Sequence, residues 1–300
     1  MIPIALLTHH NDRFAALLET AGITQLATPS EAPIWLAEPA LAAEALRQGS
    51  KPQWLASTYA GIEPLMAADL AKDYQLTNVR GIFGPLMAQY VFAHLLSRLR
   101  HLPRYATQQE QHLWQPHSYG SLQGQTLVLL GTGDIARHIA SVAAAFGMRI
   151  IGVNRRGHAV DGFERIVALP DLNHALALAD VLVSVLPSTP QSHHLLNAKT
   201  LAALPSHATL INVGRGSVLD IDALLARLDA GQLAHAVLDV FESEPLPQDS
   251  PLWQHPQVSL TPHVAATSFP EQVVRLFVDN LRRFERSERL QHLVDFTQGY

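Results

Sequence analysis

Three side chains that could bind an anion and move a proton occur in the second half of the chain. Arg215, Glu244 and His263 each follow a short apolar run of the kind that forms a buried strand. A guanidinium offers a planar fork to a carboxylate or a carbonyl oxygen. An imidazole can give or take a hydroxyl proton near neutral pH, and an adjacent carboxylate orients it and favours its charged form. Any one of the three alone is typical of a surface ion pair, but together they predict an acid–base site.

A turn rich in small residues, Gly-Thr-Gly-Asp-Ile-Ala, begins at Gly131, between an apolar run and a helical pattern. Gly131 permits a tight turn, Gly133 lets the backbone approach a pyrophosphate, and Ala136 lets the helix lie close to the strand. The pyrophosphate would sit at the positive end of that helix, beside Asp134 and Ile135. The Asp134 carboxylate would repel it unless it pointed into solvent. The context on both sides predicts a dinucleotide site rather than an ordinary strand-to-helix turn.

The next apolar run ends in Asn154, Arg155 and Arg156. An NAD site usually has an acidic residue about 20 positions after the glycine turn, where it accepts hydrogen bonds from the ribose. Guanidinium groups can instead pair with a 2′-phosphate. The three residues therefore favour NADP as the cofactor, with NAD possible; the alternative is a pair of solvated surface arginines.

Two α/β units must position these residues. The second unit has six short runs rich in β-branched residues or leucine, partly separated by helical patterns, at residues 126–130, 149–153, 181–186, 209–213, 236–240 and 258–261. They predict a Rossmann-type, doubly wound parallel sheet. Ligands of such sheets bind at the carboxyl ends of the strands, so Arg215, Glu244 and His263 should converge there although they are far apart in sequence.

The first unit is smaller and also alternates strand and helix patterns. Strands are expected at 4–8, 34–37 and 54–59, and helices at 14–21 and 39–48. A helix over 86–102, apolar on more than one side, leads into a polar surface loop at 103–121, and a last helix at about 271–286 could return the chain to the first unit. We therefore expect a substrate-binding domain at 1–88 and 267–300, and a dinucleotide-binding domain at 89–266.

Composition excludes several classes of partner. The 300 residues carry a formal net charge of −5, which gives no basic excess for a nucleic-acid backbone. The chain has no cysteine, which excludes disulfides and thiolate metal sites and fits a cytoplasmic enzyme. The apolar start of the chain lacks a basic leader and is expected to be a strand rather than a signal peptide. No apolar run approaches the roughly 18 residues of a membrane span.

The sixteen histidines raise the possibility of a metal site. Two doublets occur, His9-His10 and His193-His194, and neighbouring residues are expected to point to different faces. No His-Glu-x-x-His spacing occurs. We therefore expect no metal.

Four motifs at the ends of predicted strands match one enzyme family in type and in order. They are Leu-Pro-x-Thr, Asn-x-x-Arg-Gly, Asp-Val-Phe-x-x-Glu-Pro and Thr-Pro-His, at residues 186–189, 212–216, 239–245 and 261–263. With the glycine turn, they make the chain beyond about residue 54 resemble the D-isomer-specific 2-hydroxyacid dehydrogenases. Within that family, segments 154–156 and 114–116 look most like the glyoxylate/hydroxypyruvate reductases.

The resemblance implies a role for each matched residue. Arg215 would bind the substrate, His263 would be the acid and base, and Glu244 would support the histidine. In the first unit, which the resemblance makes flavodoxin-like, the backbone N–H groups of Ala60 and Gly61 would hold the substrate carboxylate. Asp239 would hold the nicotinamide amide. The strand-end motifs would supply cofactor contacts from Leu186, Pro187, Thr189, Val213, Gly214, Asp239 and His263.

The residues and the resemblance together predict an oxidoreductase that reduces a small 2-keto acid with NADPH, and the resemblance adds a homodimer with helix 86–102 near its interface. Two alternatives stay open. One is an NAD-linked dehydrogenase of D-2-hydroxy acids or 3-phosphoglycerate, against which the missing acid at Asn154 argues. The other is a non-catalytic nucleotide-sensing partner protein, which would not need Arg215, Glu244 and His263 together.

Overall fold

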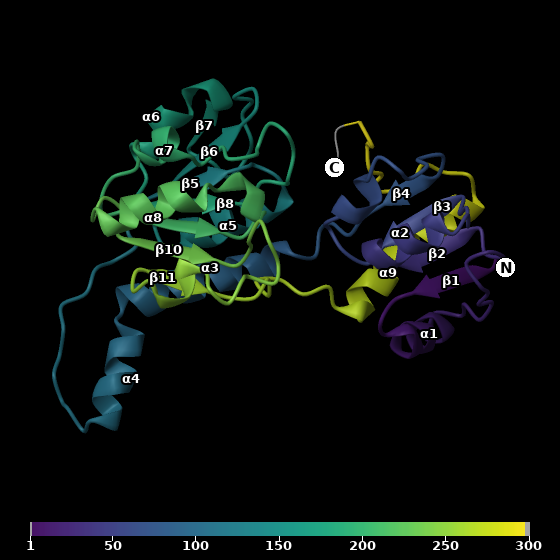
Figure 1. Cartoon of the computed structure of the whole chain (residues 1–300), viewed down its shortest axis with the longest axis horizontal. Coiled ribbons are helices and arrows are strands. Elements are labelled where there is room, and N and C mark those ends of the chain that lie inside the picture. The colour runs from purple at the N-terminus through teal and green to yellow at the C-terminus, as the bar shows by residue number, and fades with distance from the viewer. Residues whose placement is uncertain (1, 298–300) are drawn as a thin grey trace. The chain divides into compact units, whose positions relative to one another are not determined.

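The computed structural model describes residues 2–297, which form two compact units (Figure 1). Unit 1 takes the chain up to Ile82 and again from Thr267, and unit 2 is Phe83–Ala266. The expected boundary after residue 88 falls inside helix α3 (Gly84–Leu99). This helix belongs to unit 2 as a whole because it packs along α5 (Asp134–Ala145). No helix within the described residues is long and apolar enough to cross a membrane.

Unit 1 contains a four-stranded parallel sheet. Its strands, in spatial order, are β1 (Ile4–Leu7), β2 (Ile34–Ala37), β3 (Trp54–Ser57) and β4 (Gln75–Thr77). A parallel bridge pairs Ile4 with Leu26 on the other side of β1 from β2. When this bridge is counted as the second strand, the order becomes 2-1-3-4-5, which is the flavodoxin-like order. The expectation of a smaller flavodoxin-like unit is confirmed.

The last long helix packs on unit 1. The helices of this unit are α1 (Asn11–Thr20), α2 (Pro39–Arg47), the short 3-10 helix η1 (Glu63–Met66) and α9 (Pro270–Glu285). Trp54 at the start of β3 stacks on Phe277 and Phe284 of α9, with ring centroids 5.1 and 5.6 Å apart. Its indole N–H donates to Thr77 at 2.9 Å, so the ring is satisfied although it is fully buried.

Unit 2 contains a seven-stranded parallel sheet in the order β11-β10-β9-β8-β5-β6-β7. Its strands are β5 (Thr126–Leu130), β6 (Arg149–Asn154), β7 (Arg165–Ala168), β8 (Val181–Ser184), β9 (Thr209–Asn212), β10 (His235–Leu238) and β11 (Val258–Leu260). The order reverses between β5 and β8, the point where doubly wound sheets bind ligands. The predicted Rossmann-type sheet is confirmed. The edge strand β7 was missed because it begins at a charged residue and only Val167 is buried.

The central strands are covered on both faces. Residues of β5 alternate between two apolar clusters: Val128 and Leu130 face one, and Leu127 and Leu129 face the other. This explains why these strands read as continuous apolar runs rather than as alternating ones. The covering helices are α3 and α5 on the second face, with α6 (Leu172–Leu176), α7 (Ala198–Leu201) and α8 (Ile221–Asp229) contributing to the first.

The prediction of a loop throughout 103–121 is wrong. Helix α4 (Leu102–Glu110) occupies the first part of it and stands away from the sheet of unit 2 (Figure 1). Its residues are good helix formers with a proline in the first turn, but they are polar and only Gln108 is buried, so no apolar stripe marked the helix. The segment after it returns along α4, where the His117 N–H donates to Tyr105 Oη at 2.8 Å.

Candidate active site

The loop after β11 is organised around the buried carboxylate of Asp239, which follows β10 and is 1% exposed. Its Oδ1 accepts hydrogen bonds from Thr261 Oγ1 at 2.6 Å and from the Val264 N–H at 2.9 Å. Its Oδ2 accepts one from the Ala265 N–H at 3.0 Å. A buried charge is costly unless it is hydrogen-bonded, and three donors from one short segment meet that need here. Asp239 therefore determines the path of residues 261–265.

Helix α3 joins this network through Tyr90. The oxygen atoms of Tyr90 and Thr261 lie 2.5 Å apart. Because the Thr261 hydroxyl donates to Asp239, it accepts from Tyr90, which gives a chain of donors that ends on the carboxylate. Burial raises the pKa of Tyr90 to about 12, so its hydroxyl stays a donor. This link is not visible in the sequence, where Tyr90 is only one of the apolar residues of a predicted helix.

His263 and Glu244 are in direct contact. His263 has a left-handed backbone (φ 53°), and its N–H donates to the Asp239 carbonyl at 2.8 Å. Its Nδ1 lies 2.8 Å from Glu244 Oε2, while Glu244 Oε1 accepts the N–H of Phe241 at 2.9 Å. Because a carboxylate only accepts, Nδ1 carries the hydrogen, and Nε2 is the nitrogen left to exchange a proton with a ligand. Both side chains are partly exposed, so a ligand can reach them.

Arg215 lies at the end of the neighbouring strand. Asn212 at the end of β9 supports its loop, because the Asn212 amide donates to the Arg215 carbonyl at 3.0 Å and accepts from the Gly214 N–H at 3.3 Å. A Cβ on Gly216 would collide with the backbone of Phe241, so the loops after β9 and β10 are in backbone contact. Since β9, β10 and β11 are adjacent and parallel, Arg215, Glu244 and His263 follow neighbouring strand ends at one edge of the sheet.

The glycine turn has the geometry that a pyrophosphate needs. Gly131 has a positive φ of 99°, and its N–H donates to the Val153 carbonyl at 2.9 Å. Gly133 is the N-cap residue of α5, and a Cβ there would meet nothing within 4 Å, so the start of this helix is open. Ala136 is fully buried, where only a small side chain lets the helix lie against the sheet. This part of the chain fits a dinucleotide.

Asp134 and Ile135 form the first turn of α5. The carboxylate of Asp134 lies 3.8 Å from Nδ1 of His138, one helical turn further on. An acid at this end of a helix is favoured by the helix dipole, and its contact with His138 lies along the helix side. Ile135 is partly buried and packs against the apolar cluster beneath α5.

Asn154 shapes the turn after β6. Its Oδ1 accepts the N–H groups of Gly157 at 2.7 Å and Arg156 at 3.3 Å, and its Nδ2 donates to the His158 carbonyl at 2.9 Å. The same Nδ2 lies 3.3 Å from Thr132 Oγ1, which links this turn to the glycine turn. Arg155 and Arg156 are both exposed beside it.

The segment after β8 lies against the loop that carries Arg215. A Cβ on Gly214 would lie 2.6 Å from the Leu186 carbonyl oxygen, so only glycine permits this approach. Ser192 braces the segment, because its hydroxyl donates to the Pro187 carbonyl at 2.6 Å and accepts the Thr189 N–H at 2.9 Å. Val213 is buried in the apolar cluster that α3 and α5 cover. Ser192 was missed in the sequence, where no pattern singled it out.

In unit 1, the loop after β3 presents two backbone N–H groups. The carbonyls of Tyr59 and Ala60 accept hydrogen bonds from the Val79 N–H at 3.2 Å and the Asn78 amide at 2.8 Å. No hydrogen bond within the described residues uses the N–H of Ala60 or Gly61, so both are available to an anion. These two residues belong to unit 1, whereas Arg215, Glu244 and His263 belong to unit 2.

A second acid–histidine pair in unit 1 was missed. His9 follows β1 and Glu38 follows β2, and the carboxylate accepts from the His9 N–H at 2.9 Å and from Nδ1 at 2.6 Å. Burial and the negative charge of Glu38 raise the pKa of Tyr59. Glu38 directly follows a predicted strand, and this position is the signal in the sequence that could have identified it.

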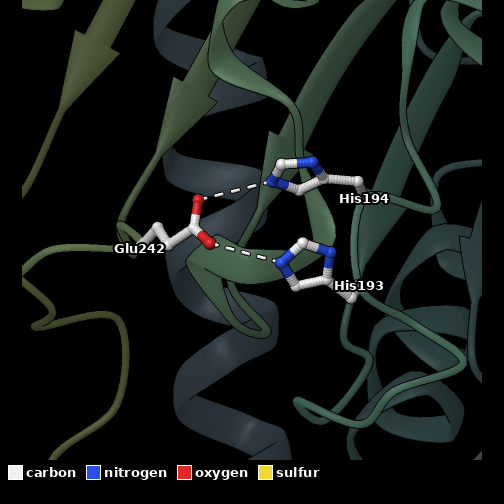
Figure 2. Close-up of side chains that lie close together, drawn as sticks. All are labelled: His193, His194 and Glu242. Carbon is white, nitrogen blue, oxygen red and sulfur yellow. Dashed lines mark hydrogen bonds and ion pairs between the residues drawn. The ribbon is translucent and has the colours of Figure 1, made fainter.

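The expectation that adjacent histidines face apart is wrong for His193 and His194. Their rings stack with centroids 4.1 Å apart, and both point toward Glu242 (Figure 2). The reason is the backbone: His194 has a positive φ of 45° and the pair lies outside any strand or helix, so the alternation of an extended chain does not apply. Among the described residues, these three form the group whose donor atoms could hold a metal ion.

Comparison with known proteins agrees with this geometry. Residues 92–265 match the family model of the D-isomer specific 2-hydroxyacid dehydrogenase, NAD binding domain. A glyoxylate/hydroxypyruvate reductase A of Yersinia enterocolitica is 36% identical over 71% of this chain and 68% of the reductase. A D-isomer specific 2-hydroxyacid dehydrogenase family protein of Aeromonas salmonicida, of known crystal structure, is 47% identical with a TM-score of 0.94, over 98% of this chain and 99% of that one.

A second crystal structure holds a cofactor. The D-isomer specific 2-hydroxyacid dehydrogenase of Xanthobacter autotrophicus, in complex with NADPH and MES, is 29% identical with a TM-score of 0.88, over 100% of this chain and 99% of that one. The family match covers more than half of the chain and includes the glycine turn, Arg215, Glu244 and His263. The chain belongs to the D-isomer specific 2-hydroxyacid dehydrogenases, the NAD(P)-dependent oxidoreductases whose motifs its strand ends carry.

Proposed function

We propose that this chain reduces a small 2-keto acid, of the glyoxylate or hydroxypyruvate type, to the D-2-hydroxy acid with NADPH. The observation that carries the proposal is the contact of 2.8 Å between His263 Nδ1 and Glu244 Oε2, one strand away from Arg215. It provides a proton donor of defined tautomer next to a cation that binds carboxylates. The Yersinia relative, a glyoxylate/hydroxypyruvate reductase, supports the substrate class.

The proton comes from His263. In the doubly protonated ring, Nδ1–H is held by Glu244, so Nε2–H is the group that donates to the keto oxygen. The negative Glu244 stabilises the charged ring before the transfer and keeps the neutral ring in the Nδ1–H tautomer after it. Reduced cofactor, when bound, supplies the hydride to the keto carbon.

In unit 2, the Arg215 fork would hold the substrate carboxylate. In unit 1, the N–H groups of Ala60 and Gly61 are the groups proposed to bind an anion. Arg215 also donates from Nη1 to the Gly214 carbonyl at 2.8 Å, which restricts how far the guanidinium can move. A fixed fork orients the keto group as well as binding it, because two parallel hydrogen bonds define the plane of the ligand.

The cofactor would lie along the open start of α5, with its pyrophosphate at Gly131 and Gly133. Its 2′-phosphate would meet Arg155 and Arg156, which are exposed beside the turn that Asn154 shapes. An NAD-linked dehydrogenase would need an acid at Asn154, whose amide is instead occupied with backbone groups. A nucleotide-sensing protein without catalysis would gain nothing from the His263–Glu244 pair.

We also propose that the protein is a homodimer. Four large apolar residues of α4 and the segment after it are exposed: Leu102, Leu113, Trp114 and Tyr119. Trp114 is 99% exposed. Apolar surface of this kind marks a contact with another protein.

Light scattering coupled to size-exclusion chromatography should give the mass of two chains. The double variant Leu113→Ser/Trp114→Ser should shift the protein toward one chain. Trp253→Ser, which removes another exposed tryptophan, should leave the mass unchanged. A native protein that runs as a single chain would contradict the proposal.

The acid–base assignment is tested by a double-mutant cycle. His263→Ala should lower kcat for keto-acid reduction by roughly 10² to 10⁴, the range for general acid catalysis. Glu244→Gln should lower it by less, because the ring remains but its charged form loses its partner. In the His263→Ala background, Glu244→Gln should have almost no further effect. An equal loss in both backgrounds would mean that Glu244 does not act through His263.

Cofactor choice is tested at the end of β6. NADPH should have a higher kcat/KM than NADH, and Arg155→Ala/Arg156→Ala should lower that ratio by about tenfold or more, because two charge-assisted contacts to the 2′-phosphate are lost. Arg149→Ala removes one arginine at the opposite end of β6 and should leave the ratio unchanged. If the ratio of kcat/KM for NADPH to that for NADH is unchanged in Arg155→Ala/Arg156→Ala, the two arginines do not bind the 2′-phosphate.

The preference for an unphosphorylated substrate is tested by comparing hydroxypyruvate with its phosphorylated form. Glu38 and Glu63 lie near the loop that presents Ala60 and Gly61, and a phosphorylated keto acid would bring a dianion toward them. Hydroxypyruvate should therefore have a kcat/KM at least about tenfold higher than 3-phosphohydroxypyruvate with NADPH. Glu38→Gln should reduce the difference in kcat/KM between the two substrates. Glu19→Gln, on the exposed face of α1, should leave it unchanged. A preference for the phosphorylated acid would favour the phosphoglycerate alternative.

A further inference from the structure

We propose that His193, His194 and Glu242 form a binding site for a divalent transition-metal ion of the zinc type on unit 2 (Figure 2). The two histidines follow β8, in the segment that continues from the Leu186–Thr189 stretch, and Glu242 follows β10. The proposed reduction uses none of the three side chains, so the site is an addition to that function and stands independently of it.

The distances between the donor atoms leave room for a shared metal ion. Nε2 of His193 lies 3.4 Å from Glu242 Oε1, and Nε2 of His194 lies 3.4 Å from Glu242 Oε2. Other histidine–carboxylate contacts among the described residues include 2.6 Å for His9, 2.8 Å for His207 and His263, and 3.3 Å for His255. Ligand atoms at about 2.1 Å from a tetrahedral zinc ion are about 3.4 Å from each other. With one ligand atom taken from each residue, the three atoms lie within 4.8 Å of one another.

The backbone holds the two histidines in place. The His193 N–H donates to the Thr189 carbonyl at 3.0 Å, and the His194 N–H donates to the Ser217 carbonyl at 2.8 Å. The amide of Asn197 donates to the His194 carbonyl at 2.9 Å. These bonds keep the left-handed conformation that turns both rings to one side. The rings are therefore oriented by the fold, and their Nε2 atoms, which are the ends that ligate metals, converge on the carboxylate.

The donor set selects the kind of metal. Two imidazole nitrogens and one carboxylate oxygen suit zinc, cobalt or nickel, whereas magnesium and calcium prefer oxygen donors and keep more of them. The three side chains are between 39% and 53% exposed, so a metal can enter from solvent and complete its coordination with water. Three protein ligands and an exposed position describe an exchangeable site rather than a closed structural one.

Occupancy would link two parts of the candidate active site. The histidines are continuous with the segment proposed to contact the cofactor, and Glu242 lies in the loop whose later residue, Glu244, holds His263. A bound metal would therefore cross-link the segments after β8 and β10. The cross-link stabilises the folded state because the unfolded chain cannot offer the three ligands together.

Calorimetric titration of chelator-stripped, tag-free protein with zinc chloride should give one tight equivalent per chain. Saturating zinc should raise Tm by about 2–5 °C. His193→Ala/His194→Ala should abolish the tight equivalent and the rise in Tm. Glu242→Gln should weaken zinc binding by about tenfold or more, since even groups that only orient a metal ligand contribute that much. Magnesium chloride should produce neither effect.

The matched control is the other histidine doublet. His9→Ala/His10→Ala removes the same two side chains from unit 1 and should keep the tight equivalent. Cobalt chloride should give the visible absorption of four-coordinate cobalt in the native protein and in this control, but not in His193→Ala/His194→Ala. The proposal is overturned if native protein binds no zinc tightly, or if the tight equivalent survives in His193→Ala/His194→Ala. Either result would leave the keto-acid assay unaffected.

Discussion

The geometry of the candidate active site depends on one buried negative charge. The Asp239 carboxylate lies beneath the sheet edge and is compensated by donors that all come from residues 261–265. A buried carboxylate is costly without such donors. The hydrogen bonds to Asp239 therefore stabilise this one conformation of the loop after β11. The left-handed backbone of His263 and the direction of its ring toward Glu244 follow from that conformation. The proton donor is thus positioned by a residue that touches no part of its ring.

The loops around this charge are layered by backbone contact. Gly216 admits the backbone of Phe241, and Gly214 admits that of Leu186, so the turns after β8, β9 and β10 lie directly on one another. Parallel strands bring their carboxyl ends to one edge, and these two glycines remove the side chains that would separate the turns. Arg215 and Glu244 follow these adjacent turns, where Arg215 donates to the Gly214 carbonyl and Glu244 accepts from the Phe241 N–H.

Features with a strong local signal could be predicted from the sequence. The central strands of unit 2 read as apolar runs because both faces of the sheet are covered there. The positions of Arg215, Glu244 and His263 after predicted strands marked them as site residues. Features that depend on tertiary contacts could not. Helix α4 has no apolar stripe, and the role of Tyr90 exists only because Thr261 arrives from a distant part of the chain. The facing rings of His193 and His194 depend on a left-handed residue that only the surrounding hydrogen bonds impose.

The turn after β6 ties the choice of cofactor to folding. Asn154 stands where an acid would contact a ribose, yet its amide nitrogen donates to the His158 carbonyl and lies beside Thr132, while its oxygen receives two backbone N–H groups. An aspartate at this position could still accept the two backbone N–H groups. Its second carboxylate oxygen, however, would face the His158 carbonyl oxygen, to which the Asn154 amide now donates. Engineering NAD specificity into this protein is therefore a problem of loop redesign, in which the turn must be rebuilt before a new ribose contact can be made.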